Sequence, residues 1–74
     1  MKLGKYKHYK GKEYNVVAIA THSETLEEMV VYEALYEIQG KGINSLWVRP
    51  KKMFEETIEV NGLIMNRFQY LPEK

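Results

Sequence analysis

The residues whose types could do chemistry gather in three short segments of this 74-residue chain. The first is the basic, tyrosine-rich stretch 4–11, the second is the polar tetrad 22–25, and the third is the run 46–50. Each lies at the end of an apolar run, where a short strand would meet a loop. Loops held by a rigid sheet often carry binding and catalytic residues, so a site is sought first in these segments.

The tetrad His22-Ser23-Glu24-Thr25 combines an imidazole, two hydroxyls and a carboxylate. A nucleophilic site needs a base placed against the nucleophile and oriented by a third group. Adjacent strand residues point to opposite faces, so His22 and Ser23 are poorly placed to pair. We therefore interpret the tetrad first as a polar turn, second as part of a binding site and third as catalytic, and we assign no catalytic residue.

A metal site is not expected. His8, His22 and Glu24 could ligate zinc, but zinc needs three or four ligands converging at about 2.0–2.2 Å, and no pair here has a diagnostic spacing. The chain has no cysteine, which removes thiolate sites and disulfides. The sequence predicts no cofactor.

Trp47 and Arg49 are expected to share one face of a strand. Tryptophan offers a flat π surface and arginine a planar fork for a carboxylate or phosphate, so the pair could bind a nucleobase, a modified side chain or an anion. The alternative is that Trp47 caps the core and Arg49 pairs with a carboxylate such as Glu24. The candidate ligand-binding residues are His22, Glu24, Tyr32, Trp47 and Arg49.

The basic N-terminal stretch supports a second hypothesis, a surface that stacks and neutralises nucleic acid. Its residues would be Lys5, Tyr6, Lys7, Tyr9 and Lys10. The net charge of +1 lacks the basic excess usual in nucleic-acid-binding domains, so this remains the alternative.

The elements that position these segments are predicted to be short strands. Residues 4–9 are typical of an edge strand, and 14–22 of a central strand, because both of its faces are largely apolar. Strict alternation would put Tyr14, Val16 and Ala18 on one face of that strand and Val17 and Ile19 on the other.

The segment 23–39 has two interpretations. Thr25 with Glu28 fits a capping box, which favours a helix at about 25–39. The run Val30-Val31-Tyr32 prefers a pleated surface. We favour a polar turn at 23–28 followed by a strand whose one face carries Val30, Tyr32, Ala34 and Tyr36.

Further along, residues 46–49 predict a strand ended by Pro50. Residues 51–56 predict one helical turn. Asn61-Gly62 is a type I′ hairpin signal within 58–65, and 67–71 supplies a last strand.

The chain is expected to form a single domain over 1–74 with its core at about 4–71. A chain this short buries only about 60% of its unfolded surface, so a shallow groove or a dimer interface is expected, in a monomer or homodimer. The N-terminus lacks a signal-peptide pattern, and no apolar run approaches the roughly 18 residues of a membrane span. With the missing cysteines, this favours the cytoplasm and no membrane partner.

The strand pattern predicts a mostly β fold, a small SH3-like barrel of five or six short antiparallel strands with one short helical turn. The alternative is a small α+β fold that contains the helix at 25–39.

The ordered motifs Gly4-x-Tyr6-x-His8-Tyr9-Lys10-Gly11, His22-Ser23-Glu24-Thr25 and Leu46-Trp47-Val48-Arg49-Pro50 resemble a small bacterial family of domains of unknown function. The resemblance covers Gly4 to about Tyr70. It implies a standalone domain and brings no activity with it.

The function predicted first is therefore a cytoplasmic, noncatalytic binding module for a peptide, a modified residue or a small anion. Nucleic-acid binding is the alternative, and a small enzyme comes third.

Overall fold

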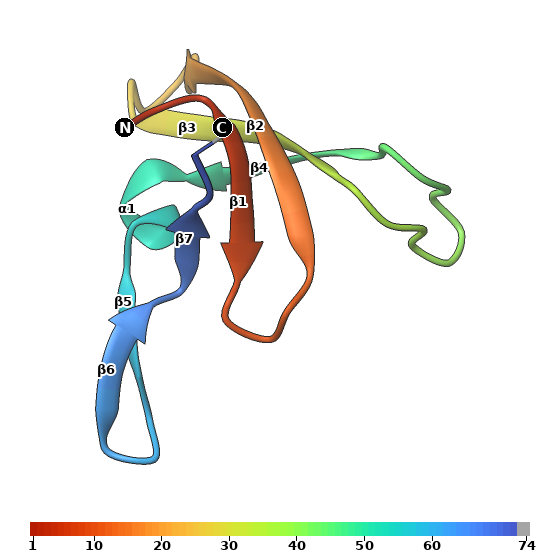
Figure 1. The fold of residues 1–74 in the computed structure, drawn as a ribbon. Coiled ribbons are helices and arrows are strands. Elements are labelled where there is room, and N and C mark those ends of the chain that lie inside the picture. Colours follow the sequence, from red (N-terminus) through yellow and green to blue (C-terminus); the bar gives the residue numbers. More distant parts are fainter. Residues whose placement is uncertain (73–74) are drawn as a thin grey trace.

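Residues 1–72 are described by the computed structural model, and over them the chain forms seven strands and one short helix (Figure 1). The mostly β prediction is confirmed. The elements are β1 (Gly4–His8), β2 (Glu13–Thr21), β3 (Glu28–Ala34), β4 (Leu46–Pro50), α1 (Lys51–Phe54), β5 (Thr57–Val60), β6 (Leu63–Asn66) and β7 (Phe68–Tyr70).

Five strands form an antiparallel sheet in the order β4-β3-β2-β1-β7, and β5 and β6 form a separate hairpin. No pairing within residues 1–72 joins β4 to β7, so these residues form no closed barrel and the predicted SH3-like barrel of five or six strands is not confirmed. The helix α1 lies near the opening between these edge strands in Figure 1, and its Phe54 is buried in the core. At this opening the core is therefore covered by side chains such as Phe54 and not by a further strand pairing.

The strand β1 lies inside the sheet, between β2 and β7, and not at an edge as predicted. Its tyrosine Tyr6 pairs with Tyr14 on one side and Tyr70 on the other. The short strand β7 thus pairs with the side of β1 that was expected to be a free sheet edge.

A bulge between Val16 and Ala18 interrupts the alternation expected for β2. Val16 is opposite Tyr32 and Ile19 is opposite Val30, so Val16 and Ile19 both face the core. Val17 is left 39% exposed. One extra residue therefore changes which side chains face inward after Val16.

The helix alternative for 25–39 is wrong, because β3 occupies Glu28–Ala34. Val30, Tyr32 and Ala34 are buried, as the strand interpretation predicted. Thr25 does not begin a helix. Its hydroxyl accepts the N–H of Glu27, and Leu26 has a positive φ of 62°, which fits the predicted polar turn.

The core lies on the inner face of the curled sheet. Its buried side chains are Tyr6, Val16, Val30, Tyr32, Phe54 and Phe68. Phe54 from α1 stacks on Phe68 from β7, with ring centres 4.1 Å apart and planes 4° apart. This stack connects the helix to the sheet edge farthest from β4.

The β5–β6 hairpin and the loop between β3 and β4 project away from the sheet (Figure 1). Asn61 and Gly62 have φ values of 51° and 81°, which confirms the predicted type I′ turn. No helix over residues 1–72 is long and apolar enough to cross a membrane.

The hairpin turn gives a first testable expectation. A Cβ at Gly62 would meet no atom within 4 Å, so Gly62→Val changes only the backbone preference. We expect the variant to weaken the hairpin by about 1–3 kcal/mol, because a β-branched residue is strained at positive φ. Amide hydrogen exchange should accelerate in β5 and β6 and stay unchanged in β1–β3.

Gly62→Asn is the matched control, because asparagine tolerates this region better than other side chains. Equal protection of the hairpin in the valine variant and the parent would contradict the turn assignment.

Candidate functional site

The sheet register brings together polar and aromatic side chains that are far apart in the sequence. His8 pairs with Phe68, Tyr14 with Ala34, and Arg49 with Val30, all on the inner face. The group formed there is called the cationic aromatic cluster, and it consists of His8, Tyr14, Tyr36, Arg49, Arg67 and Phe68.

Phe68 is at the centre of this cluster. Its ring centre lies 4.9 Å from that of His8 and 5.7 Å from that of Tyr14, both in edge-to-face arrangements. The guanidinium carbon of Arg49 lies 5.6 Å from the same centre, within the range of a cation–π contact. Phe68 therefore fixes a cation and an imidazole on one ring.

Positive charge in the cluster exceeds the negative charge that the described residues supply. Arg67 binds Glu56 through Nη2 at 2.8 Å, but its Nε is buried and has no hydrogen-bond partner there. Arg49 is half-buried and forms no ion pair within residues 1–72. Arg49 thus retains donor capacity for an anion, whereas the unpaired Nε of Arg67 is buried.

Burial lowers the pKa of His8, and the nearby charges of Arg67, Arg49 and Lys10 lower it further. The Nδ1 atom of His8 accepts the backbone N–H of Lys10 at 3.2 Å, which fits a neutral ring with its proton on Nε2. Burial and the positive charge around it therefore both favour the neutral form of His8.

Two tyrosines form the polar side of the cluster. The hydroxyls of Tyr14 and Tyr36 are 2.6 Å apart, and either can donate. Burial raises the pKa of Tyr14, and this hydrogen bond raises it further, so the phenol stays neutral. Lys12 lies over the Tyr36 ring, with Nζ 4.8 Å from the ring centre.

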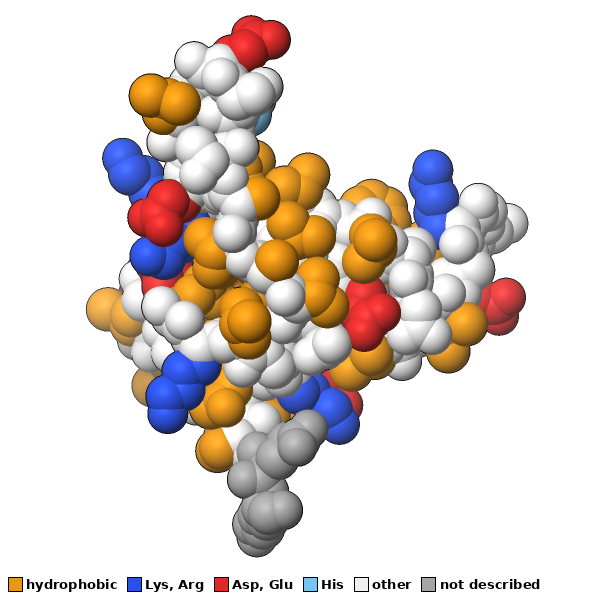
Figure 2. Space-filling model, turned by 90° about the horizontal axis from the view of Figure 1, so that it is seen from above, with side chains coloured by type: hydrophobic (Ala, Val, Ile, Leu, Met, Phe, Trp, Pro, Cys, Tyr) orange, Lys and Arg blue, Asp and Glu red, His pale blue; other side chains and the backbone are white. Residues whose placement is uncertain are grey.

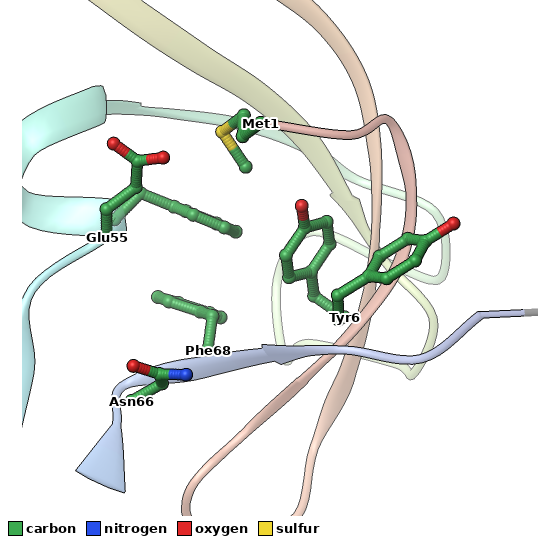
Figure 3. Close-up of a pocket in the computed structure, with 7 residues that line it drawn as sticks. Met1, Tyr6, Glu55, Asn66 and Phe68 are labelled. Carbon is green, nitrogen blue, oxygen red and sulfur yellow. The ribbon is translucent and has the colours of Figure 1, made fainter.

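A hollow of about 280 Å³ lies beside the core and is lined by Tyr6, Phe54, Phe68 and Tyr70. Figure 3 shows Tyr6 and Phe68 around it. Glu55, Asn66 and Met1 complete its lining. The charged side chain in this lining is the carboxylate of Glu55, so the hollow does not suit an anion. The cationic aromatic cluster has the opposite charge and is the better candidate for one.

Three of the five predicted ligand-binding residues come together. Trp47 pairs with Tyr32, and Arg49 is two residues further along β4 on the same face. Tyr32 is 6% exposed and belongs to the core, so it supports the site and does not line it. Trp47 is 36% exposed, does not cap the core as the alternative had it, and donates from Nε1 to the hydroxyl of Ser45 at 2.8 Å.

His22 and Glu24 do not join them. The Nδ1 atom of His22 accepts the backbone N–H groups of Glu24 and Thr25, so the imidazole holds its own turn. Thr25 in this turn lines a hollow with Lys51 and Lys52 of α1. Strand pairing places the turn beyond the Glu28 end of β3, whereas Trp47 is opposite Tyr32. The turn and Trp47 therefore lie at different positions along β3.

The N-terminal set is divided between the two faces of β1. Tyr6 is buried at 6% exposure, so its ring does not offer a stacking face. Lys5 points outward and pairs with Glu13 at 3.6 Å. Lys7 is exposed, and Tyr9 and Lys10 lie just after the strand, with Nζ of Lys10 5.8 Å from the Tyr9 ring centre.

Sequence reasoning did not place five of the cluster residues in the ligand-binding set: His8, Tyr14, Tyr36, Arg67 and Phe68. Alternation along β1 puts His8 on the face of Tyr6, which is a signal the sequence contains. Arg67 gave none, because its charge reaches His8 only once β7 pairs with β1 and the Tyr9 N–H bonds to the Arg67 carbonyl. Over residues 1–72, no three acidic or histidine side chains are grouped to hold a metal ion.

These features define a small, mostly β domain with a cationic and aromatic inner face. The model of the family described as "Protein of unknown function (DUF1653)" matches residues 4–70, so the chain belongs to that family. The chain is also similar to a crystal structure of a DUF1653 protein from Bordetella bronchiseptica, with 32% identity and a TM-score of 0.86. The similarity covers 99% of this chain and 95% of that one. No curated protein matches.

The tyrosine pair gives the second prediction. In a double-mutant cycle, Tyr14→Phe and Tyr36→Phe should show a coupling of about 1 kcal/mol in urea denaturation, because the hydrogen bond is part-buried. If the two substitutions have additive effects on the free energy of unfolding, the hydrogen bond between the two hydroxyls contributes nothing to stability.

The same pair predicts a loss of stability at high pH. A raised pKa means that the folded chain keeps the phenol proton longer than the unfolded chain. Stability is therefore complete below the ordinary pKa of 10.0 and falls as pH rises above it. Tyr14→Phe should reduce this loss of stability. The part due to Tyr6 should remain, because burial raises the pKa of Tyr6 as well.

Proposed function

We propose that this chain is a cytoplasmic, noncatalytic binding module whose cationic aromatic cluster takes a small anionic group. The group is a carboxylate or phosphate, either free or on a peptide side chain. The main support is Arg49, a half-buried guanidinium held at Phe68 without a carboxylate in the described chain. A guanidinium in this setting prefers a planar, bidentate oxygen ligand.

The surrounding groups support the same ligand chemistry. Arg67 has a buried Nε donor with no acceptor in residues 1–72. Burial first, and then the charges of Arg67, Arg49 and Lys10, lower the pKa of His8. Trp47 adds an exposed aromatic surface beside Arg49 on the same strand. An anion would reduce the repulsion among these cations as well as accept their hydrogen bonds.

The other hypotheses have less support. Catalysis would need a nucleophile and a base in contact, and the cluster offers a neutral phenol pair and an imidazole of lowered pKa with no nucleophile beside it. Nucleic-acid binding would need exposed rings along a basic groove, and Tyr6 of the N-terminal set is buried.

The third prediction tests Arg49 by thermal melting with phosphoserine, citrate and sulfate, against chloride at matched ionic strength. Ligand at ten times its dissociation constant should stabilise the parent by about 1.4 kcal/mol. Arg49→Lys should lose this gain while the ligand-free chain melts like the parent, because lysine keeps the charge but not the planar donors.

Sulfate also stabilises folded proteins through exclusion from their surface, so a charge-matched control is needed. Arg49→Gln and Lys52→Gln remove the same charge, and Lys52 is an exposed residue of α1 outside the cluster. A specific effect disappears in the first variant and persists in the second. Equal stabilisation of both variants by all three anions would exclude the cluster as the site.

His8 supplies the fourth prediction. Its lowered pKa means that folding favours the neutral ring, so this group's contribution to stability falls as pH drops below 6.5. A bound anion favours the imidazolium and should raise the pKa of His8. Sulfate, whose charge is constant in this range, should therefore bind more tightly at pH 5.5 than at pH 7.5.

Proton NMR titration of the His8 ring with and without sulfate measures this shift directly, and His8→Gln should remove the pH dependence of binding. If sulfate leaves the pKa of His8 unchanged while it binds, the anion lies elsewhere.

A further inference from the structure

The strand β4 has one open edge. It pairs with β3 alone, and it stands at the end of the strand order. Ala34 donates its N–H to the carbonyl of Ser45. Backbone groups of successive residues in a strand face opposite edges, and this bond shows that those of Ser45 face β3. The N–H and C=O groups of Trp47 and Arg49 therefore also face β3, and those of Leu46 and Val48 face the open edge. No other backbone partner for Leu46 or Val48 occurs within residues 1–72.

This edge carries little of the usual protection against strand pairing, because its inward-pointing charge, Arg49, and its Pro50 both lie at one end of the strand. Natural edge strands carry lysine, proline or bulges that prevent another strand from adding. Here the outward side chains are Leu46 and Val48, which are 67% and 59% exposed, and proline comes only at the last position of the strand. The edge is therefore chemically suited to accept a strand.

The middle of the outer face next to this edge is also apolar, between the Asn15–Glu33 pair beside Leu46 and the Thr21–Glu28 pair at the other end. The register sets Ala18, Val31 and Val48 in one row and Ala20, Met29 and Pro50 in the next. Figure 2, which looks down on the outer side of β2 and β3, shows hydrophobic side chains gathered over the middle of the view. An antiparallel sheet that faced water on this side would be expected to present polar residues there.

We propose that β4 pairs antiparallel with β4 of a second copy of this chain, around a two-fold axis at Val48. Val48 then faces Val48 of the second copy, and Leu46 faces Pro50. The two Val48 residues exchange two hydrogen bonds. Each Leu46 N–H donates to the Pro50 carbonyl opposite, so proline's missing N–H removes only the return bond.

The strand sequence fits its own antiparallel copy. The same register sets Trp47 opposite Arg49 of the second copy, on the inner face and in the closer, non-hydrogen-bonded type of pair. An indole and a guanidinium in this arrangement attract each other through a cation–π contact. Each copy thereby adds its Trp47 to the arginine of the other copy's cationic aromatic cluster.

A second copy suits the edge better than a charged peptide. The outward side chains Leu46 and Val48 are uncharged, so a two-fold pairing sets no like charges directly opposite each other. The two Arg49 side chains become diagonal neighbours, each opposite a tryptophan. A five-residue edge buries less than the roughly 800 Å² per partner of a standard stable interface. We therefore expect a dimer that dissociates on dilution.

The fifth prediction concerns the mass in solution. Sedimentation equilibrium of the ligand-free parent at millimolar concentration should give twice the monomer mass, with a fall toward the monomer on dilution. Val48→Lys should remain monomeric at every concentration, because it sets two lysines against each other at the axis. Val17→Lys is the matched control, since Val17 is also an exposed valine but lies in β2, away from the edge, and should still dimerise.

Cross-linking tests the register without relying on affinity. The chain has no cysteine, so Val48→Cys introduces a single thiol. The two Val48 residues would form a hydrogen-bonded pair, in which opposed Cα atoms are about 5.5 Å apart, within disulfide range. Mild oxidation should give a covalent dimer from Val48→Cys and at most a trace from Val17→Cys.

A parent that is monomeric at millimolar concentration overturns the dimer, and so does equal cross-linking of the two cysteine variants. A Val17→Lys variant that loses the dimer as fully as Val48→Lys would move the interface from the β4 edge to the outer face. These measurements use no ligand, and Val48 lies outside the cationic aromatic cluster. The dimer and the anion site can therefore fail independently.

Discussion

The stack of Phe54 on Phe68 is the contact on which the rest of the structure depends. It joins α1, which follows β4 at one edge of the sheet, to β7 at the other edge, across an opening that no strand pairing closes in residues 1–72. A 74-residue chain has a small core, and two stacked aromatic rings provide much of its buried area. The same Phe68 ring receives His8 and Arg49, so the core contact and the candidate site are built on one side chain.

Local pattern was enough to predict most strands, the helical turn and the Asn61-Gly62 turn, because alternation, Pro50 and positive φ act within a few residues. Over residues 1–72 the expected closed barrel does not form, for a non-local reason. Whether β4 meets β7 depends on how tightly the sheet curls and on what fills the gap, here Phe54. The bulge after Val16 was equally hidden, since Val17 and Ile19 alternate in sequence as in a regular strand.

In the candidate site, too, some residues could be predicted from local spacing and others could not. Trp47 and Arg49 share a strand, so their common face followed from their spacing. The charge of Arg67 reaches His8 through the pairing of β7 with β1, and no local pattern indicates it. His22 accepts the backbone N–H of Glu24 and so holds its own turn, a role that residue type alone does not indicate.

An open sheet edge and an uncompensated arginine on the same strand have a physical connection. A closed barrel would pair the edge of β4 and restrict access to Arg49 from that side. Leaving β4 open keeps Arg49 half-buried at an aromatic ring, where its charge is weakly hydrated and its interaction with an anion is stronger than in water. The cost is an exposed apolar strand, and its pairing with an identical strand would satisfy the free backbone groups while setting a second aromatic surface beside each arginine.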